Sequence, residues 1–270
     1  MKIPNLGSRK NRILLKELVK TDFKLRYQGS LLGYLWAVLR PMMLFAILYV
    51  VFAKILKMGS EIPHYPVYLL AGTVLWSFFS ECTNQGIQAI VARGDLLRKI
   101  SFPKWIIVVS ATVTALINFL INLGVVIIFA IINGVTPNLV WLLVPLIILE
   151  LYFLSLGISF FLGAINVKYR DISSIWEVFM QALFYAVPVI YPITMVTSAS
   201  PLAAKIFLLN PIAQVIQDVR YFLITDQTIT TWNYLENRFL YLIPLGLVSL
   251  VIILGGIYFR KRSKYFAEEA

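Results

Sequence analysis

The chain has 270 residues, of which 60% are hydrophobic and 14% carry a charge, and its formal net charge is +11. This composition is too apolar for a soluble domain and is typical of a protein that crosses a membrane several times. The single cysteine, Cys82, lies within an apolar run, so a disulfide framework is excluded. The positive charge gathers at the ends of apolar runs, which indicates membrane orientation and not nucleic-acid binding.

The N-terminal segment is basic and lacks the long apolar core of a cleavable signal peptide. Residues 11–28 are predicted to form an amphipathic helix, with leucine, valine and phenylalanine on one half and mostly lysine on the other. Asp22 and Arg26 intrude on the apolar half, where a spacing of four would let them pair. We expect this helix, the main element of residues 1–30, to lie in the cytoplasmic headgroup layer. The alternative is a soluble helix that packs on a partner.

Six apolar segments follow, and each is predicted to be a membrane-spanning helix of about 20 residues. Residues 105–149 carry no charge and are too long for one span, so the turn-forming residues at 133–138 are expected to divide them into a helical hairpin. The expected spans cover residues 31–53, residues 65–91, two spans within 105–165, residues 175–193 and residues 239–259.

The region between the fifth and sixth spans is less regular. Pro188 and Pro192 are expected to break the end of the fifth helix. Beyond them, two apolar runs are separated by Asn210 and Pro211, and each run is too short to cross a membrane comfortably. We therefore expect residues 201–224 to form short helices that are re-entrant or lie at the outer interface.

The positions of the basic residues predict the orientation of the chain. Eighteen of the 24 lysines and arginines lie before the first span, in the loop 93–104, at 168–170 or after the last span. Basic loops favour the cytoplasmic side of a membrane. The sequence thus predicts an all-α integral membrane protein with six spans and both termini cytoplasmic. Residues 31–264 would form its transmembrane domain and residues 265–270 a cytoplasmic tail.

The loop 93–104, with the sequence RGDLLRKISFPK, is a candidate contact for a cytoplasmic partner. One helical turn within it would present an apolar patch ringed by charges. The patch comprises Leu96, Leu97 and Ile100, and the ring comprises Asp95, Arg98 and Lys99. Phe102 and Pro103 should then stop the turn, because proline disfavours a helix at the residue before it. The alternative is an ordinary basic loop that sets the topology.

Three charged residues, Arg40, Glu81 and Glu150, fall inside the expected spans. Charged side chains are costly in hydrocarbon, so each is a candidate functional group. The two acids could form a proton relay of the kind that secondary transporters use. The alternative is that they are protonated or hydrogen-bonded packing residues.

Aromatic residues are abundant and provide a second set of candidates. Most such residues face lipid or pack inside a protein, but some could line a path for sugars, because the apolar face of a sugar stacks on an aromatic ring. The candidates for a translocation path, including the charged residues above, are Trp36, Arg40, Phe45, Tyr49, Phe52, Trp76, Phe79, Glu81, Glu150 and Tyr185.

The sequence lacks the motifs of several enzyme classes. It contains no G-x-x-x-x-G-K-[ST], so it is not expected to bind the phosphates of ATP in a P-loop. It also contains no H-E-x-x-H, no G-x-S-x-G and no cysteine pair, and His64 is its only histidine. We therefore expect no catalytic residue, cofactor or metal ion in this chain.

Several short motifs in a fixed order resemble those of one transporter family. The motifs are Arg26-Tyr27, Leu32-Gly33-Tyr34-Leu35-Trp36 with Pro41, Gly72 with Trp76, Phe78 and Phe79, Leu96-Leu97 with Lys99, Phe102-Pro103, Tyr169-Arg170-Asp171-Ile172, Pro188 with Pro192, and Asn210-Pro211 with Arg220. Along nearly its whole length the chain resembles the permease subunits of ABC-2 type exporters for lipid-linked polysaccharides, which include teichoic-acid and O-antigen exporters.

This resemblance implies roles for three regions. It implies that 93–104 is a coupling helix that inserts into a separate ATPase subunit, which binds ATP-Mg. It implies that Tyr169, Arg170 and Asp171 form a second cytoplasmic contact. Residues 201–224, with Asn210, Pro211 and Arg220, would form short gating helices on the outer side.

The resemblance also implies an assembly and a location. Two copies of the permease would join two copies of the ATPase, and a lipid-linked glycan would cross the bacterial cytoplasmic membrane at the interface between the permeases. Three alternatives remain: an ABC-2 permease for a drug or small lipid, a proton-coupled transporter that uses Glu81 and Glu150, and an intramembrane enzyme that acts on a lipid-linked sugar. The enzyme ranks last, because no cluster of catalytic acids lies near a loop.

Overall fold

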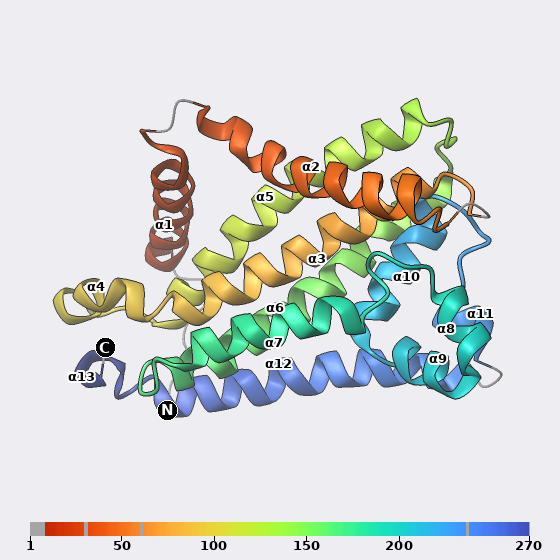
Figure 1. The fold of residues 1–270 in the computed structure, drawn as a ribbon. Helices are drawn as coiled ribbons and strands as arrows, with labels where there is room; N and C mark the ends of the chain where they lie inside the picture. The colour runs from red at the N-terminus through yellow and green to blue at the C-terminus, as the bar shows by residue number, and fades with distance from the viewer. Residues whose placement is uncertain (1–8, 30–31, 60–61, 236–237, 270) are drawn as a thin grey trace.

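The computed structural model describes residues 9–29, 32–59, 62–235 and 238–269, and in these ranges it contains helices and loops but no strand (Figure 1). The helices are α1 (Arg9–Tyr27), η1 (Gly33–Leu35), α2 (Trp36–Leu48), η2 (Tyr49–Ile55), α3 (Tyr65–Gln88), η3 (Val91–Arg93), α4 (Gly94–Lys99), α5 (Trp105–Ile132), η4 (Leu139–Leu143), α6 (Val144–Asn166), α7 (Ile172–Ala186), α8 (Ile193–Ala199), α9 (Pro201–Leu208), α10 (Pro211–Leu223), α11 (Thr231–Tyr234), η5 (Arg238–Tyr241), α12 (Leu242–Arg262) and α13 (Phe266–Glu269).

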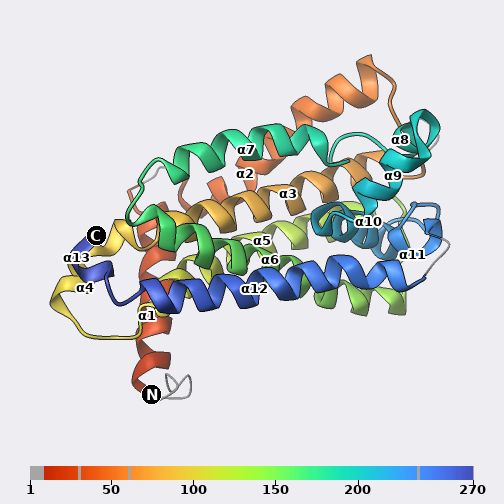
Figure 2. The same cartoon turned by 90° about the horizontal axis from the view of Figure 1, so that it is seen from below.

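The long helices α2, α3, α5, α6, α7 and α12 run along a common direction and form a bundle (Figures 1 and 2). Helix α1 lies across one end of this bundle, where α4 and α13 also lie. We call this end the basic end, because it contains the basic loop 93–104 and the basic last turn of α12. The short helices α8, α9 and α11 lie at the opposite end.

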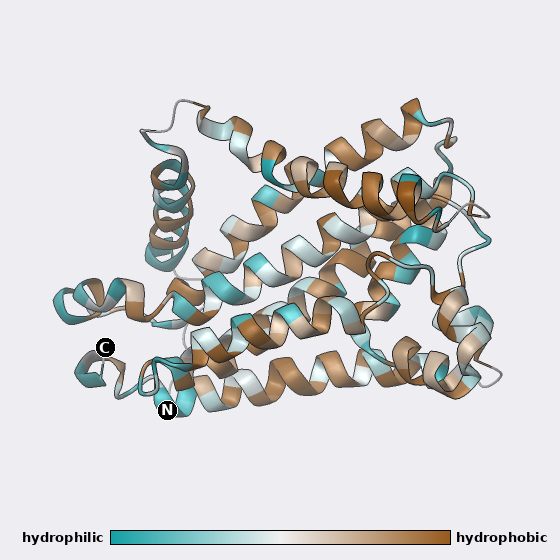
Figure 3. Ribbon diagram, in the orientation of Figure 1, coloured by the Kyte–Doolittle hydropathy of each residue, from teal (hydrophilic) through white to brown (hydrophobic). Residues whose placement is uncertain are grey.

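Among the residues that the structure describes, four helical segments are long and apolar enough to cross a membrane by themselves. They are Gly33–Ile55, Trp105–Ile132, Leu139–Asn166 and Phe239–Arg262, and the pair α9 and α10, bent by 91°, would make a fifth if it counts as one broken span. The expected count of six is thus not reproduced by length and apolarity alone. Helix α7 has only 15 residues, and α3, although it is 24 residues long, is more polar and is coloured paler than its neighbours in Figure 3. The chain is nonetheless an all-α, multi-pass membrane protein.

Helix α3 is the centre of the packing. It contacts α5, α6, α7 and α10, and most of its side chains are buried, among them Val67, Leu69 and Phe79. A central helix covered by other helices meets little lipid, which explains why it tolerates polar residues. By contrast, α2 has no buried residue among those described and α7 has only Met180. The outer faces of α2 and α7 are therefore exposed and apolar.

Helices α6 and α12 pack tightly against each other at two glycines. A Cβ atom on Gly157 would lie 2.8 Å from the backbone of Ile252, and one on Gly255 would lie 2.3 Å from the carbonyl oxygen of Gly157. Small residues let two helix backbones approach, which is the usual way that membrane helices pack tightly. The α6–α12 contact thus depends on the absence of side chains at these positions.

The local breaks in the chain agree with the sequence in most places. Helices α5 and α6 form the expected hairpin, α7 ends before Pro188, and α9 and α10 are separated at Asn210 and Pro211. The side chain of Asn210 accepts a hydrogen bond of 2.9 Å from the backbone nitrogen of Ile212 and so caps α10. Because Pro211 has no N–H to leave unpaired, it suits the first position of that helix.

Candidate functional site

The short helix α4 is the most prominent feature of the basic end. Asp95 lies in its first turn, and Arg98 and Lys99 lie in its last turn, an arrangement that complements the helix dipole. These three charged side chains are exposed, whereas Leu97 is buried. The helix therefore presents a charged outer surface and is held to the protein through Leu97.

The expected apolar patch on this helix does not form, and that prediction was wrong. Helix α4 ends at Lys99, Ile100 has an extended backbone and an exposed side chain, and Leu96 is only half-buried. Phe102 and Pro103 are half-buried in the connection that leads into α5. The chain must turn back to start α5, so it leaves the helix too early for a spacing of four to bring Ile100 beside the leucines.

Arg93 anchors the start of α4 to two other helices. It forms an ion pair with Asp22 of α1, and its Nη1 donates to the backbone oxygen of Ile107 and to Oγ of Ser110 in α5, both at 3.4 Å. The side chains of the ion pair are 19% and 21% exposed, so solvent screens the pair only in part. Asp22 and Arg26 do not pair with each other as expected. Asp22 pairs with Arg93, and Arg26 pairs with Glu81.

The loop between α6 and α7 forms a second exposed region at the basic end. Tyr169, Arg170 and Asp171 are all exposed there, and with Lys168 they line a shallow groove of about 510 Å³ that Glu269 of α13 also borders. Asp171 lies at the N-cap position of α7, but its side chain makes no capping hydrogen bond. The oxygen of Asn166 in α6 accepts from the backbone nitrogen of Ser173 at 3.2 Å instead, so a residue outside the loop caps the helix.

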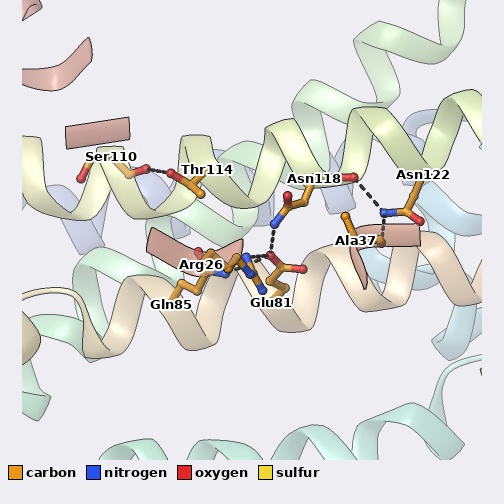
Figure 4. Close-up of polar contacts among 8 residues, drawn as sticks. All are labelled: Arg26, Ala37, Glu81, Gln85, Ser110, Thr114, Asn118 and Asn122. Carbon is orange, nitrogen blue, oxygen red and sulfur yellow. Dashed lines mark hydrogen bonds and ion pairs between the residues drawn. The ribbon is translucent and has the colours of Figure 1, made fainter. Parts of the chain in front are cut away.

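A cavity of about 380 Å³ opens between α1, α2, α3 and α5. Glu81 of α3 lines this cavity. One oxygen of its carboxylate accepts hydrogen bonds from Arg26 of α1, from Nε2 of Gln85 at 2.9 Å and from Nδ2 of Asn118 in α5 at 2.8 Å (Figure 4). Trp36 and Arg40 of α2 line the same cavity. Of the residues proposed for a path, the structure brings Trp36, Arg40 and Glu81 together here.

A polar stripe along α5 joins this cavity to the basic end. Ser110, Thr114, Asn118 and Asn122 follow one another at intervals of four and are all buried. Nδ2 of Asn122 donates to the backbone oxygen of Ala37 in α2 at 3.0 Å (Figure 4). At the other end of the stripe, Oγ of Ser110 accepts from Arg93. The spacing is present in the sequence, because positions four apart share a helix face, but uncharged side chains in an apolar span do not indicate a polar site by themselves.

The aromatic candidates are dispersed and do not share one cavity. Trp76 and Phe79 are buried between α3 and α7, where Trp76 packs on Phe184 with ring centroids 5.5 Å apart. Phe45 stacks on Tyr49 at 5.8 Å. Phe52 is half-buried in η2, and Tyr185 of α7 is exposed. Only Trp36 among these aromatic residues lines the cavity around Glu81.

Glu150 lies in a different polar cluster from Glu81. Nε2 of Gln214 in α10 is 3.5 Å from a carboxylate oxygen of Glu150 and 2.6 Å from one of Asp218, and the hydroxyl of Tyr241 is 3.3 Å from the same Asp218 oxygen. None of these groups contacts Glu81, whose partners are Arg26, Gln85 and Asn118. The two acids therefore do not form a joint relay in this structure.

Arg220 is an internal clamp of the bundle. It is completely buried in α10 and donates to the backbone oxygens of Tyr68 at 3.1 Å, Pro188 at 2.7 Å and Val189 at 2.5 Å, and to Oε1 of Gln217 at 2.9 Å. Its guanidinium also lies 3.6 Å from the centre of the Tyr68 ring. Arg220 thus joins α10 to α3 and to the segment after α7.

The fold and these sites define a multi-pass α-helical membrane protein with a short charged helix at its basic end and a polar cavity inside the bundle. Residues 13–224 match the profile of the ABC-2 type transporter family, and the chain belongs to that family. It is similar to the O-antigen export system permease protein RfbA of Myxococcus xanthus, with 30% identity over 95% of both chains. It is also similar to a protein of the same name from Klebsiella pneumoniae, with 28% identity over 94% of both chains. The polysialic acid transport protein KpsM of Escherichia coli is 24% identical over 69% of this chain and 73% of its own.

Proposed function

We propose that this chain is the permease subunit of an ATP-driven exporter that moves a lipid-linked cell-surface polysaccharide, of O-antigen or teichoic-acid type, across the bacterial cytoplasmic membrane. The observation that carries the proposal is its similarity, over about 95% of its length, to O-antigen export permeases. The polar head of such a substrate cannot cross hydrocarbon unaided. A bundle with polar groups inside its membrane-spanning part offers the shielded environment that the substrate requires.

We infer that the energy comes from a separate ATPase subunit that binds ATP-Mg. The sequence has no P-loop, and the exposed charged face of α4 offers a docking surface, with the loop 169–171 as a second contact. The ion pair between Arg93 and Asp22 supports this role, because it ties the start of α4 to α1 while Ser110 ties it to α5. A displacement of α4 would thus be passed to two helices. In this proposal the basic end and both termini are cytoplasmic.

The functional unit in this proposal contains two copies of the chain. The outer faces of α2 and α7 are apolar and exposed, and a second copy could cover them. The cavity lined by Trp36, Arg40 and Glu81 borders α2, so a glycan that passes between two copies would meet these side chains. Tyr185 on the exposed face of α7 is a further candidate for contact with the glycan. The residues 201–224 would close the outer end of this path.

The test is purification of the tagged chain from its native membranes in mild detergent, followed by a search for a stoichiometric soluble ATPase. We expect an ATPase to be retained by the wild type and lost when Arg98→Glu and Lys99→Glu reverse the charge of α4. Lys205→Glu, an exposed change on α9 at the opposite end, is the matched control and should retain it. The proposal fails if the wild-type chain is purified alone and ATP does not stimulate export.

A measurement of export distinguishes between the possible classes of substrate. Cells with the wild-type chain should display the polysaccharide at their surface, and cells with the reversed α4 should accumulate it inside. If surface polysaccharide is unchanged but a drug or short lipid is retained, the chain is an ABC-2 permease for small molecules. If transport depends on a proton gradient and not on ATP, the chain is a proton-coupled transporter and not an exporter subunit.

A further inference from the structure

Residues 263–269, which follow α12, fold back onto the basic end. After α12 ends at Arg262, the backbone nitrogen of Tyr265 donates to the carbonyl oxygen of Arg262 at 3.0 Å, and α13 follows. Nη2 of Arg262 then contacts both carboxylate oxygens of Glu269, at 3.2 and 3.0 Å. The ends of most domains are poorly ordered unless something ties them down. Here an ion pair closes the turn, so the tail is held in one arrangement.

Phe266 is the centre of this arrangement. Its side chain is completely buried, although it lies near the end of the chain. Its ring meets the edge of Phe259 in α12, with centroids 5.2 Å apart. Nζ of Lys104, in the connection between α4 and α5, lies 5.9 Å from the ring centre. The ring therefore fills the space between α12 and the α4–α5 connection.

Helix α13 also contacts α4 directly (Figures 1 and 2). Partial burial lowers the pKa of Lys104, and the nearby carboxylate of Glu268 acts in the opposite direction, which places an acid of the tail near this lysine. Glu269 borders the groove that contains Tyr169 and Asp171. The tail thus touches both exposed regions of the basic end, which are far apart in the sequence.

We propose that α13 is a brace that holds α4 in its working position, and that Phe266 is the positioning residue of this brace. The inference rests on the proposed function, in which α4 receives the motion of an ATPase. Arg93 fixes the start of α4 to α1 and α5. Helix α13 contacts α4, and its Phe266 joins it to α12 through Phe259 and to the α4–α5 connection at Lys104. With both contacts present, a displacement of α4 moves three helices together.

Loss of the brace has a defined consequence. Helix α4 would remain attached at Arg93 and through the buried Leu97, so a partner could still bind its charged face. It would, however, move without drawing α12 with it. ATP hydrolysis would continue, and less polysaccharide would be exported for each ATP.

The first experiment uses the purified chain without any ATPase, so its result does not depend on the proposed function. Cys82, the only cysteine, is replaced by alanine, and a spin label is attached at Arg98→Cys on the exposed face of α4. We expect Phe266→Ala to increase the mobility of the label, and Phe266→Leu, which still fills the site, to restore most of the order. Tyr265→Ala, a change of the exposed neighbour, is the control. Unchanged mobility in Phe266→Ala would overturn the brace.

The second experiment measures coupling in the assembled exporter. We expect Phe266→Ala to lower the ratio of polysaccharide exported to ATP hydrolysed by about 2- to 30-fold, with the rate of hydrolysis unchanged. If that variant does not fold, Glu269→Gln opens the tail by removing the ion pair and should lower the ratio in the same direction. An unchanged ratio with a mobile label refutes the positioning role. If no ATPase binds the wild type, the proposed function fails while the mobility result still decides the brace.

Discussion

Replacing Arg220 by methionine tests how α10 is held in the bundle. Arg220→Met keeps an unbranched apolar stem but removes the guanidinium and with it every hydrogen-bond donor. The backbone oxygens of Tyr68, Pro188 and Val189 and the side-chain oxygen of Gln217 then each lose the hydrogen bond from Arg220. The Gln217 oxygen still accepts from the hydroxyl of Tyr68 at 3.2 Å. Arg220→Lys keeps the charge and up to three donors but loses the planar fork that reaches acceptors on separate segments. We expect lysine to be intermediate between arginine and methionine.

The magnitude follows from the number of acceptors and their burial. A hydrogen bond between membrane helices contributes about 0.6 kcal/mol on average and about 1.7 kcal/mol at most, and a buried acceptor left without a partner costs about 1–3 kcal/mol. For these four acceptors we expect Arg220→Met to lower the free energy of unfolding by about 3–6 kcal/mol. That is a large part of the roughly 5–15 kcal/mol that stabilises a typical domain. The melting temperature should fall by about 10 °C or more.

The assay is thermal melting of a fluorescent fusion in mild detergent, followed by size-exclusion chromatography. Lys205→Met on α9 is the matched control, because it removes an exposed cation from a neighbouring helix without changing a buried contact. We expect the control to melt with the wild type. If Arg220→Met also melts within about 2 °C of the wild type, the four hydrogen bonds do not hold α10, and the clamp is refuted.

Three further predictions concern other contacts. Gly157→Ala would place a Cβ atom 2.8 Å from the backbone of α12, so we expect thermal melting to show a loss of about 1–3 kcal/mol in the free energy of unfolding. Gly256→Ala, whose Cβ atom would meet open space, should leave this free energy unchanged. Glu81→Ala leaves three donors without their acceptor and should cost about 1–3 kcal/mol, while Glu81→Gln, which keeps an oxygen, should cost less. Asp22→Asn should weaken the attachment of α1 by about 1 kcal/mol, since the pair is partly exposed, and exchanging Asp22 and Arg93 should restore part of that loss in a double-mutant cycle.

Each of these predictions has an outcome that contradicts it. Equal melting of Gly157→Ala and Gly256→Ala would mean that α6 and α12 are less closely packed than in this structure. Equal losses for the alanine and glutamine variants of Glu81 would show that its carboxylate charge, and not its acceptor oxygen, is what the cluster needs. If the double-mutant cycle for Asp22 and Arg93 shows no coupling energy, their ion pair does not anchor α4.

The sequence alone predicted where most helices begin and end, because these features depend on neighbouring residues. The long uncharged stretch with its turn at 133–138 predicted the α5–α6 hairpin, and Asn210 and Pro211 predicted the break between α9 and α10. Apolar length, turn residues and proline act locally, so a linear pattern is sufficient to detect them. The polar stripe on α5 was also present in the sequence at a regular spacing.

The partners of the charged residues were decided only by the tertiary structure. Arg26 and Glu81 are 55 positions apart, and Arg220 and Tyr68 are 152 apart, so no local pattern links them. A helical wheel placed Asp22 and Arg26 on one face but could not show that each reaches a different helix. The sequence likewise predicted no more than a cytoplasmic tail for residues 265–270, whereas the structure buries Phe266 in it. A charged or aromatic side chain in a helical bundle takes its role from whichever helix packs beside it, and that choice is made by the fold as a whole.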